Sequence, residues 1–223
     1  YFDDERNKFY LDRIVRKCYF PTLNLIYELI KETNGKFKVS FGATGIFFDQ
    51  LKKWHPEIIE LFQKLAQTGS VEFVGETYYH SLASLYSIRD FQEQVLLHKN
   101  LIKKLFNQEA KVFANTELIY FDELTQIVKN LGFKAILTEG VPWILEWRSP
   151  NFIYQDPEQN LKILLRNYKL SDDVSFRFSA RWWEEWPLTA DKFATWLEAH
   201  NGNGEVINLF MDFETFGEHQ WEE

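Results

Sequence analysis

The sequence has 223 residues, of which 45% are hydrophobic, and a formal net charge of −8. This length suits one α/β or all-β barrel domain, which runs to roughly 200–250 residues. The acidic balance disfavours a nucleic-acid partner. No stretch reaches the ~18–20 apolar residues of a membrane span. We therefore expect one domain over residues 1–223 that binds neither nucleic acid nor a membrane.

The first half of the sequence alternates helical and strand patterns. Apolar residues recur at helical spacing from Lys8 to Lys31, and Asn34-Gly35 ends that helix. Cys18 lies inside it and is the single cysteine, so we interpret it as a buried structural thiol. The sequence shows no secretory signal pattern, and we expect a cytoplasmic protein. The following predicted elements are a strand at Lys36–Phe41, helices at Ile46–Trp54 and Pro56–Thr68, a strand at Val71–Val74 and a helix at Arg89–Phe106.

The second half repeats the alternation. Its predicted elements are a strand at Lys111–Ala114, a helix at Asp122–Leu131, strands at Lys134–Leu137 and Leu161–Leu165, a short helix starting at Ser171, a helix at Thr189–His200 and a strand at Glu205–Met211, with Trp143–Gln159 irregular. Strands separated by helices favour parallel strands joined by right-handed crossovers, hence an α/β barrel or a doubly wound sheet. The sequence has no glycine-rich dinucleotide motif and no phosphate loop.

Titratable side chains, most of them acidic, follow nearly every predicted strand. They are Glu76 and His80, then Glu117, Glu139, Arg166, and finally Asp212, Glu214, Glu218 and His219. Working residues of α/β barrels follow the carboxyl ends of strands, although such acids also serve as helix caps. A ring of acids suits glycoside cleavage by two carboxylates or metal binding. The five histidines are scattered without a His-x-x-x-His pair, so we predict no metal and no cofactor.

Two stretches resemble the catalytic motifs of glycoside hydrolase family 57, in its α-amylase branch. These stretches are Asn115–Tyr120 and Met211–His219. The residues Phe2–Glu5, Arg177–Ser179 and Glu185–Phe193 look like the same branch, so the resemblance covers essentially the whole chain.

The resemblance implies a (β/α)7 barrel, a distorted version of the eight-stranded α/β barrel. It implies cleavage of α-1,4-glucosidic bonds in starch, glycogen or maltooligosaccharides with retention of anomeric configuration. In the family pattern Glu117 is the nucleophile and Asp212 the acid/base. The family's first motif, His-Gln-Pro, would precede Tyr1, and its helical region would follow Glu223. We therefore expect the first barrel strand and the C-terminal helices to lie outside these 223 residues.

Several further residues are candidates for contact with an α-glucan or maltooligosaccharide substrate. Tryptophan rings stack on sugar rings, and we expect two or three of the loop tryptophans to do so, while Trp196 lies in a helix and is predicted to be core. The loop tryptophans are Trp143, Trp147, Trp182, Trp183, Trp186 and Trp221. The proposed substrate contacts are Glu76, His80, Glu214, His219, Trp183 and Trp221.

The surroundings of the two carboxylates can also be predicted. Glu117 lies in apolar company at Leu118–Tyr120, which favours a paired or working charge. Glu214 is two residues from Asp212 and would point the same way in an extended segment. Apolar side chains around Asp212 would favour its protonated form, and the candidates are Phe210, Phe213 and Phe216. For Arg166 and Arg177, ion pairing is favoured over sugar binding.

Three alternatives remain open from the sequence. A 4-α-glucanotransferase would use the same carboxylates and differ only in the acceptor. A metal-dependent polysaccharide deacetylase would share a similar barrel but requires clustered histidines. A glucan-binding protein without turnover is the third. Retention predicts a carboxyl separation near 5–5.5 Å rather than about 6.5–9.5 Å. Nothing in the sequence specifies an oligomeric state.

Overall fold

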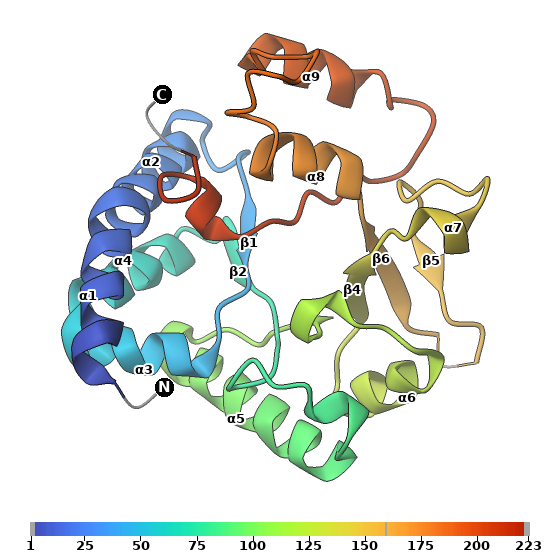
Figure 1. Cartoon of the computed structure of the whole chain (residues 1–223). Helices are drawn as coiled ribbons and strands as arrows, with labels where there is room; N and C mark the ends of the chain where they lie inside the picture. Colours follow the sequence, from blue (N-terminus) through green and yellow to red (C-terminus); the bar gives the residue numbers. More distant parts are fainter. Residues whose placement is uncertain (1–2, 159, 221–223) are drawn as a thin grey trace.

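The structure, a computed structural model, describes residues 3–158 and 160–220. Helices lie around the outside of a central set of strands, as Figure 1 shows, so the α/β prediction is confirmed. The helices are α1 Asp4–Ile14, α2 Phe20–Glu32, α3 Gly45–Trp54, α4 Pro56–Gln67, α5 Ile88–Phe106, α6 Asp122–Asn130, α7 Pro142–Leu145, α8 Tyr168–Ser175 and α9 Ala190–Glu198. The strands are β1 Val39–Phe41, β2 Val71–Phe73, β3 Val112–Ala114, β4 Ala135–Glu139, β5 Tyr154–Gln155 and β6 Lys162–Arg166.

The strands form a parallel series whose carboxyl ends share one side. β1 pairs with β2, and β3, β4 and β6 pair in that order, all in parallel. A bridge between Gly75 and Phe113 joins the two groups. A second bridge, from Arg166 to Asn208, adds the extended segment that precedes Asp212. Parallel strands joined by helices place the loops that follow β1, β2, β3, β4 and β6 around a common face.

Residues of the strands alternate between the barrel interior and the helical layer. Residues that lie side by side in β3, β4 and β6 form rows across the sheet. One row packs against α5 and α6, and the next row faces the barrel interior together with Phe210. The outward row is Phe113, Ile136 and Ile163, and the inward row is Ala114, Leu137 and Leu164. The period of two explains why each strand reads as a short apolar run, since both faces are buried.

The N-terminal helices form the largest core cluster with β1 and β2. The stretch predicted as one helix is α1 and α2 joined by a π-helical turn at Val15–Tyr19. Pro21, in the first turn of α2, has no N–H to donate to the carbonyl of Lys17, which accounts for an irregular turn at this place. Cys18 lies in the turn and is fully buried, as predicted.

Three local predictions were wrong. Glu205–Met211 is extended but pairs with β6 only at Asn208, so it is not a strand. α8 begins at Tyr168, three residues before the predicted start at Ser171, and the side chain of the preceding Asn167 accepts from the N–H of Leu170. Trp143–Gln159, predicted to be irregular, contains α7 and β5, and β5 runs antiparallel to β6. Among the described residues, no helix is both long and apolar enough to cross a membrane.

Candidate active site

Glu117 lies on a strained turn directly after β3. Glu117 has φ +55° and ψ 24°, and Leu118 also has a positive φ of +53°. Left-handed backbone costs a residue other than glycine about 1–3 kcal/mol, and such strain concentrates at functional sites. Two side chains hold the turn: the amide of Asn115 donates to the carbonyl of Ile119 at 3.0 Å, and the hydroxyl of Thr138 donates to that of Leu118 at 2.9 Å.

The turn presents the Glu117 carboxylate to solvent beside His80. The Glu117 side chain is 70% exposed, so the expectation of apolar surroundings was wrong, although the charge is paired. Nε2 of His80 lies 3.0 Å from Oε1 of Glu117. A hydrogen bond of 3.0 Å between the buried hydroxyls of Thr77 and Thr116 ties the His80 loop to the Glu117 turn. Sequence reasoning missed these threonines and Asn115. Their position as polar residues directly after buried strands was the pattern that could have indicated them.

Glu76 lies half-buried between β1 and the Asp212 segment. A Cβ added to Gly42 would lie 3.4 Å from Oε1 of Glu76 and 3.9 Å from the ring of Phe210, so a larger residue would crowd both. Burial raises the pKa of Glu76 to about 8. The carboxyl is therefore protonated at neutral pH and can donate a hydrogen bond to a sugar oxygen.

A neutral histidine supports Glu76 from below. His98, in α5, is fully buried, and burial lowers its pKa. Its Nε2–H donates to the carbonyl of Ala43 at 2.9 Å, and its Nδ1 accepts from the N–H of Glu76 at 3.4 Å. These partners define the tautomer. The sequence offered only a lone histidine on a helix, which does not reveal this role.

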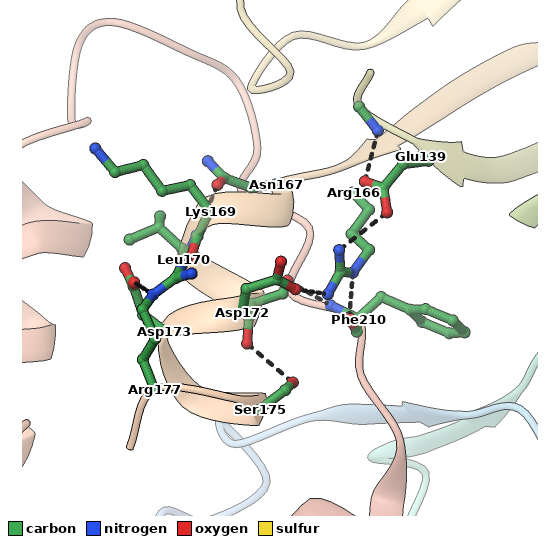
Figure 2. Close-up of polar contacts among 12 residues, drawn as sticks. Glu139, Arg166, Asn167, Lys169, Leu170, Asp172, Asp173, Ser175, Arg177 and Phe210 are labelled. Carbon is green, nitrogen blue, oxygen red and sulfur yellow. Dashed lines mark hydrogen bonds and ion pairs between the residues drawn. The ribbon is translucent and has the colours of Figure 1, made fainter. Parts of the chain in front are cut away.

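Arg166, at the end of β6, links the end of β4, helix α8 and the segment that precedes Asp212, and Figure 2 shows its contacts. Its guanidinium donates to Glu139 at 2.9 Å, to Asp172 at 2.5 Å and to the carbonyl of Phe210 at 2.6 Å. Arg166 is buried, so these charges stabilise one another away from water. On the other face of α8, Arg177 pairs with Asp173 at 2.6 Å (Figure 2). Both arginines form the ion pairs that the sequence favoured.

The residues after Asp212 are fixed to the N-terminal helices. They form a 3-10 turn, Phe213–Thr215, that packs on the π-helical turn. The hydroxyl of Tyr19 donates to Glu214, and the thiol of Cys18 donates to the carbonyl of Phe213 at 3.1 Å. Burial and the charge of Glu214 raise the pKa of Cys18 to about 12, so the thiol stays protonated.

A glycine is required where the turn meets the helix. A Cβ at Gly217 would collide with the carbonyl of Lys17, and the backbone there has φ +133°. The adjacent carboxylate of Glu218 pairs with Arg13 in α1. The sequence Phe216-Gly217-Glu218 therefore has a local structural reason besides its place in the resemblance.

Two expectations about the neighbours of Asp212 were wrong. Glu214 lies in the 3-10 turn rather than in an extended segment, so the two-residue spacing does not align it with Asp212. The phenylalanines do not enclose Asp212, which is exposed. Phe210 packs into the barrel interior, Phe213 stacks on Tyr19, and Phe216 is itself 46% exposed.

The predicted aromatic contacts are spread over the surface. Trp183 packs edge-to-face on Trp196 with ring centroids 6.0 Å apart, and Arg177 lies over its ring. Trp196 is half-buried on α9 rather than core, which corrects that prediction. His219 is exposed beyond the turn. Trp221 lies outside the described residues. Among the described residues, Trp143, Trp147 and Trp182 are each at least 81% exposed.

Other features do not belong to this face. A hollow of about 600 Å³ is lined by Lys38, Ser70 and Lys111, at the opposite, amino ends of β1, β2 and β3. Within residues 3–158 and 160–220, no group of three or more His, Cys, Asp and Glu side chains could hold a metal ion.

The fold and the site together define an α/β barrel with carboxylates at the carboxyl ends of its strands. The chain belongs to glycosyl hydrolase family 57, whose profile matches residues 1–223. The structure is similar to that of the 4-α-glucanotransferase from Thermococcus litoralis, with a TM-score of 0.78 at 18% identity over 94% of this chain and 31% of that one. The (β/α)7 barrel expected from the resemblance is thereby confirmed.

Curated relatives point to the same family. The chain is 52% identical, over its full length, to a protein provisionally named an α-amylase from Methanocaldococcus jannaschii. It is 22% identical over 94% of its length to α-amylase 1 of Dictyoglomus thermophilum. It spans 47% of the first of these relatives and 29% of the second.

Proposed function

We propose that the protein carrying this chain acts on α-1,4-glucans by a retaining double displacement, as an α-amylase-like hydrolase. The observation that carries the proposal is the strained, solvent-facing placement of Glu117, because a nucleophile must reach the substrate and backbone strain persists only where the fold enforces it. Family membership and the α-amylase names of two relatives support the same reaction class.

In the first step, a carboxylate oxygen of Glu117 attacks the anomeric carbon. The glycosidic C–O bond breaks, and Asp212 donates its proton to the departing oxygen. His80, 3.0 Å from the carboxylate, would orient Glu117. Asp212 is exposed and can therefore reach the glycosidic oxygen of a bound sugar.

In the second step, Asp212 takes a proton from water. The resulting nucleophile attacks the anomeric carbon, and the bond to Glu117 breaks with its carboxylate restored. Two displacements at one carbon give net retention. The carboxyl separation of about 5–5.5 Å stays a prediction of this mechanism.

The remaining candidate contacts have distinct proposed parts. The neutral carboxyl of Glu76 would donate to a sugar oxygen. His219, Trp183 and Trp221 are proposed as sugar contacts from the sequence alone. Glu214, which accepts from Tyr19, would act mainly by orienting the turn that carries Asp212.

A 4-α-glucanotransferase is the second candidate, favoured by the similarity to the T. litoralis structure. In that case a sugar hydroxyl replaces water in the second step, while Glu117 and Asp212 keep their roles.

The test is product analysis on maltooligosaccharides with the full-length protein and its Glu117→Gln variant. Shorter products alone would indicate hydrolysis, and longer products as well would indicate transfer. The exposed Glu32→Gln, in the last turn of α2 before β1, makes the same chemical change away from the carboxyl ends of the strands and should leave turnover intact. Equal activity of Glu117→Gln and wild type would refute the nucleophile.

A further inference from the structure

We propose that Arg166 is a positioning residue for the acid/base: it sets the place of Asp212 by holding the peptide of Phe210, two residues earlier. The inference rests on the proposed function of Asp212 and adds a residue that neither the catalytic motifs nor the substrate contacts include.

Little backbone pairing holds the segment before Asp212, apart from its start, where the N–H groups of Glu205 and Val206 donate to the carbonyl of Asn151. Glu205–Met211 would sit at the edge of β6, yet the ladder between them consists of one bridge at Arg166 and Asn208. The N–H of Asn167 donates to the carbonyl of Asn208 at 2.9 Å, and the amide of Asn208 donates to the carbonyl of Leu165 at 3.0 Å. Beyond Asn208 strand pairing ends, four residues before Asp212.

Side chains replace the missing ladder at Phe210. Nε of Arg166 donates to the carbonyl of Phe210 at 2.6 Å, and the backbone N–H of Phe210 donates to the hydroxyl of Ser171 at 3.1 Å. The backbone N–H and carbonyl of Phe210 are therefore both bound by side chains, one from α8 and one from β6. Ser171 is fully buried, and its own site is defined by the hydrogen bond of the next helical turn, in which Ser175 donates to its carbonyl.

The guanidinium is itself fixed from the end of β4 and from helix α8. Glu139 closes β4, and its second oxygen accepts from the N–H of Gly140 at 2.9 Å. Asp172 projects from α8, as Figure 2 shows. Arginine suits this task because its planar fork donates in fixed directions to three acceptors at once, which lysine cannot do.

The geometry thus assigns to Arg166 a rigid link from β4 and α8 to the Asp212 segment. Displacing a catalytic group by about 1 Å can cost on the order of 10²-fold in rate. The rate should fall wherever Asp212 must transfer a proton. Attack by Glu117 should keep its rate on a substrate whose leaving group needs no proton.

Leaving groups of different basicity separate those steps. A maltooligosaccharide needs a proton on its departing oxygen, whereas α-maltosyl fluoride releases fluoride as the C–F bond breaks, without acid assistance. For Arg166→Met in the full-length protein, kcat/KM should fall about 10²-fold on maltooligosaccharide and stay close to wild type on the fluoride. Azide, which attacks the glycosyl-enzyme without a base, should raise kcat on the fluoride and yield the α-azide.

Two further variants guard against simple loss of folding. Ser171→Ala leaves Arg166 and its ion pairs in place and should give the same pattern with a smaller loss, on the order of tenfold. Lys99→Met is the control. Lys99 is a half-buried cation that donates to the carbonyl of Leu131, before the start of β4. Its loss should leave kcat/KM unchanged on both the maltooligosaccharide and the fluoride.

The outcomes distinguish the inference from the function beneath it. Asp212→Asn must show the substrate dependence and the azide effect, and if it does not, the proposed function fails. If Asp212→Asn shows both while Arg166→Met and Ser171→Ala lose activity equally on the two substrates, Arg166 only stabilises the fold and the inference is overturned.

Discussion

Glu117 follows strand β3, whereas Asp212 follows a segment joined to β6 by a single bridge, and two different kinds of contact hold them. The Glu117 turn is held by neutral hydrogen bonds from its immediate neighbours in space, Asn115 and Thr138. The Asp212 segment is held by charged and buried side chains from distant parts of the chain, Arg166 on one side and Tyr19 on the other.

The difference follows from how each segment enters the sheet. β3 pairs with β4 over three residues, so the backbone before Glu117 is already fixed and only the turn needs support. The segment before Asp212 has one bridge, so side chains supply what the ladder does not. We therefore expect Asp212 to depend on contacts that involve charged groups, and Glu117 to depend on neutral hydrogen bonds.

The largest expected effect on stability is that of Arg166→Met. Removing the cation leaves Glu139 and Asp172 facing each other in a partly buried site, and breaking a buried pair costs about 3–5 kcal/mol. Urea unfolding measures the loss. Adding Glu139→Gln and Asp172→Asn to Arg166→Met should recover part of it, because no uncompensated charge remains. A loss no larger than that of Lys99→Met would contradict the account.

Tyr19→Phe tests the other support of the Asp212 segment. The variant removes the hydroxyl that donates to Glu214 and should cost up to about 3 kcal/mol, as expected for a hydrogen bond to a charged group. Tyr27→Phe is the matched control in α2, since the ring of Tyr27 packs under Lys31 and Lys64. Equal unfolding free energies for the two variants would show that Tyr19 does not anchor the turn.

Asn115→Ala tests the neutral support of Glu117. It removes donors to Ser84 and to the carbonyl of Ile119, which are worth about 1 kcal/mol each. The strained turn should then relax, so kcat on maltooligosaccharide should fall together with stability. Asn24→Ala, which removes a similar donor to a carbonyl within α2, should leave kcat unchanged. Unchanged kcat in Asn115→Ala would break the comparison.

A further prediction concerns Glu76 and depends on pH. Burial raises the pKa of Glu76 to about 8 from an ordinary value of 4.5, so between these pH values the folded state retains a proton that the unfolded state has lost. Wild-type stability should therefore fall relative to Glu76→Gln as pH rises from 4.5 to about 8. Unfolding free energies of both proteins across this range measure the difference. A constant difference would show that the carboxyl is not held neutral.

Most of the barrel could be predicted from the sequence, because buried parallel strands and amphipathic helices leave clear periodic patterns. The segment Glu205–Met211 shows the limit. Its apolar residues read as a strand, but its backbone is bound by Arg166 and Ser171, and no local pattern reveals a tertiary contact that replaces a ladder.

The candidate site divides in the same way. The position of Glu117 after β3 follows from the alternation of elements, and the roles of Glu117 and Asp212 stay predictions from the resemblance. The left-handed backbone at Glu117 and the burial of Glu76 could not be anticipated, since they depend on Thr138, Gly42 and Phe210 from other strands. Trp196 has a helical pattern, but α9 has no buried residue.

The central claim is that Glu117 becomes covalently bound to sugar. The most direct measurement uses a fluorinated maltosyl fluoride that slows release of the glycosyl-enzyme, followed by mass spectrometry of peptides from the full-length protein. The account predicts a mass increase of one glycosyl unit on Glu117, absent from Glu117→Gln. A label on another carboxylate, or an unlabelled protein that gives inverted product, would contradict it.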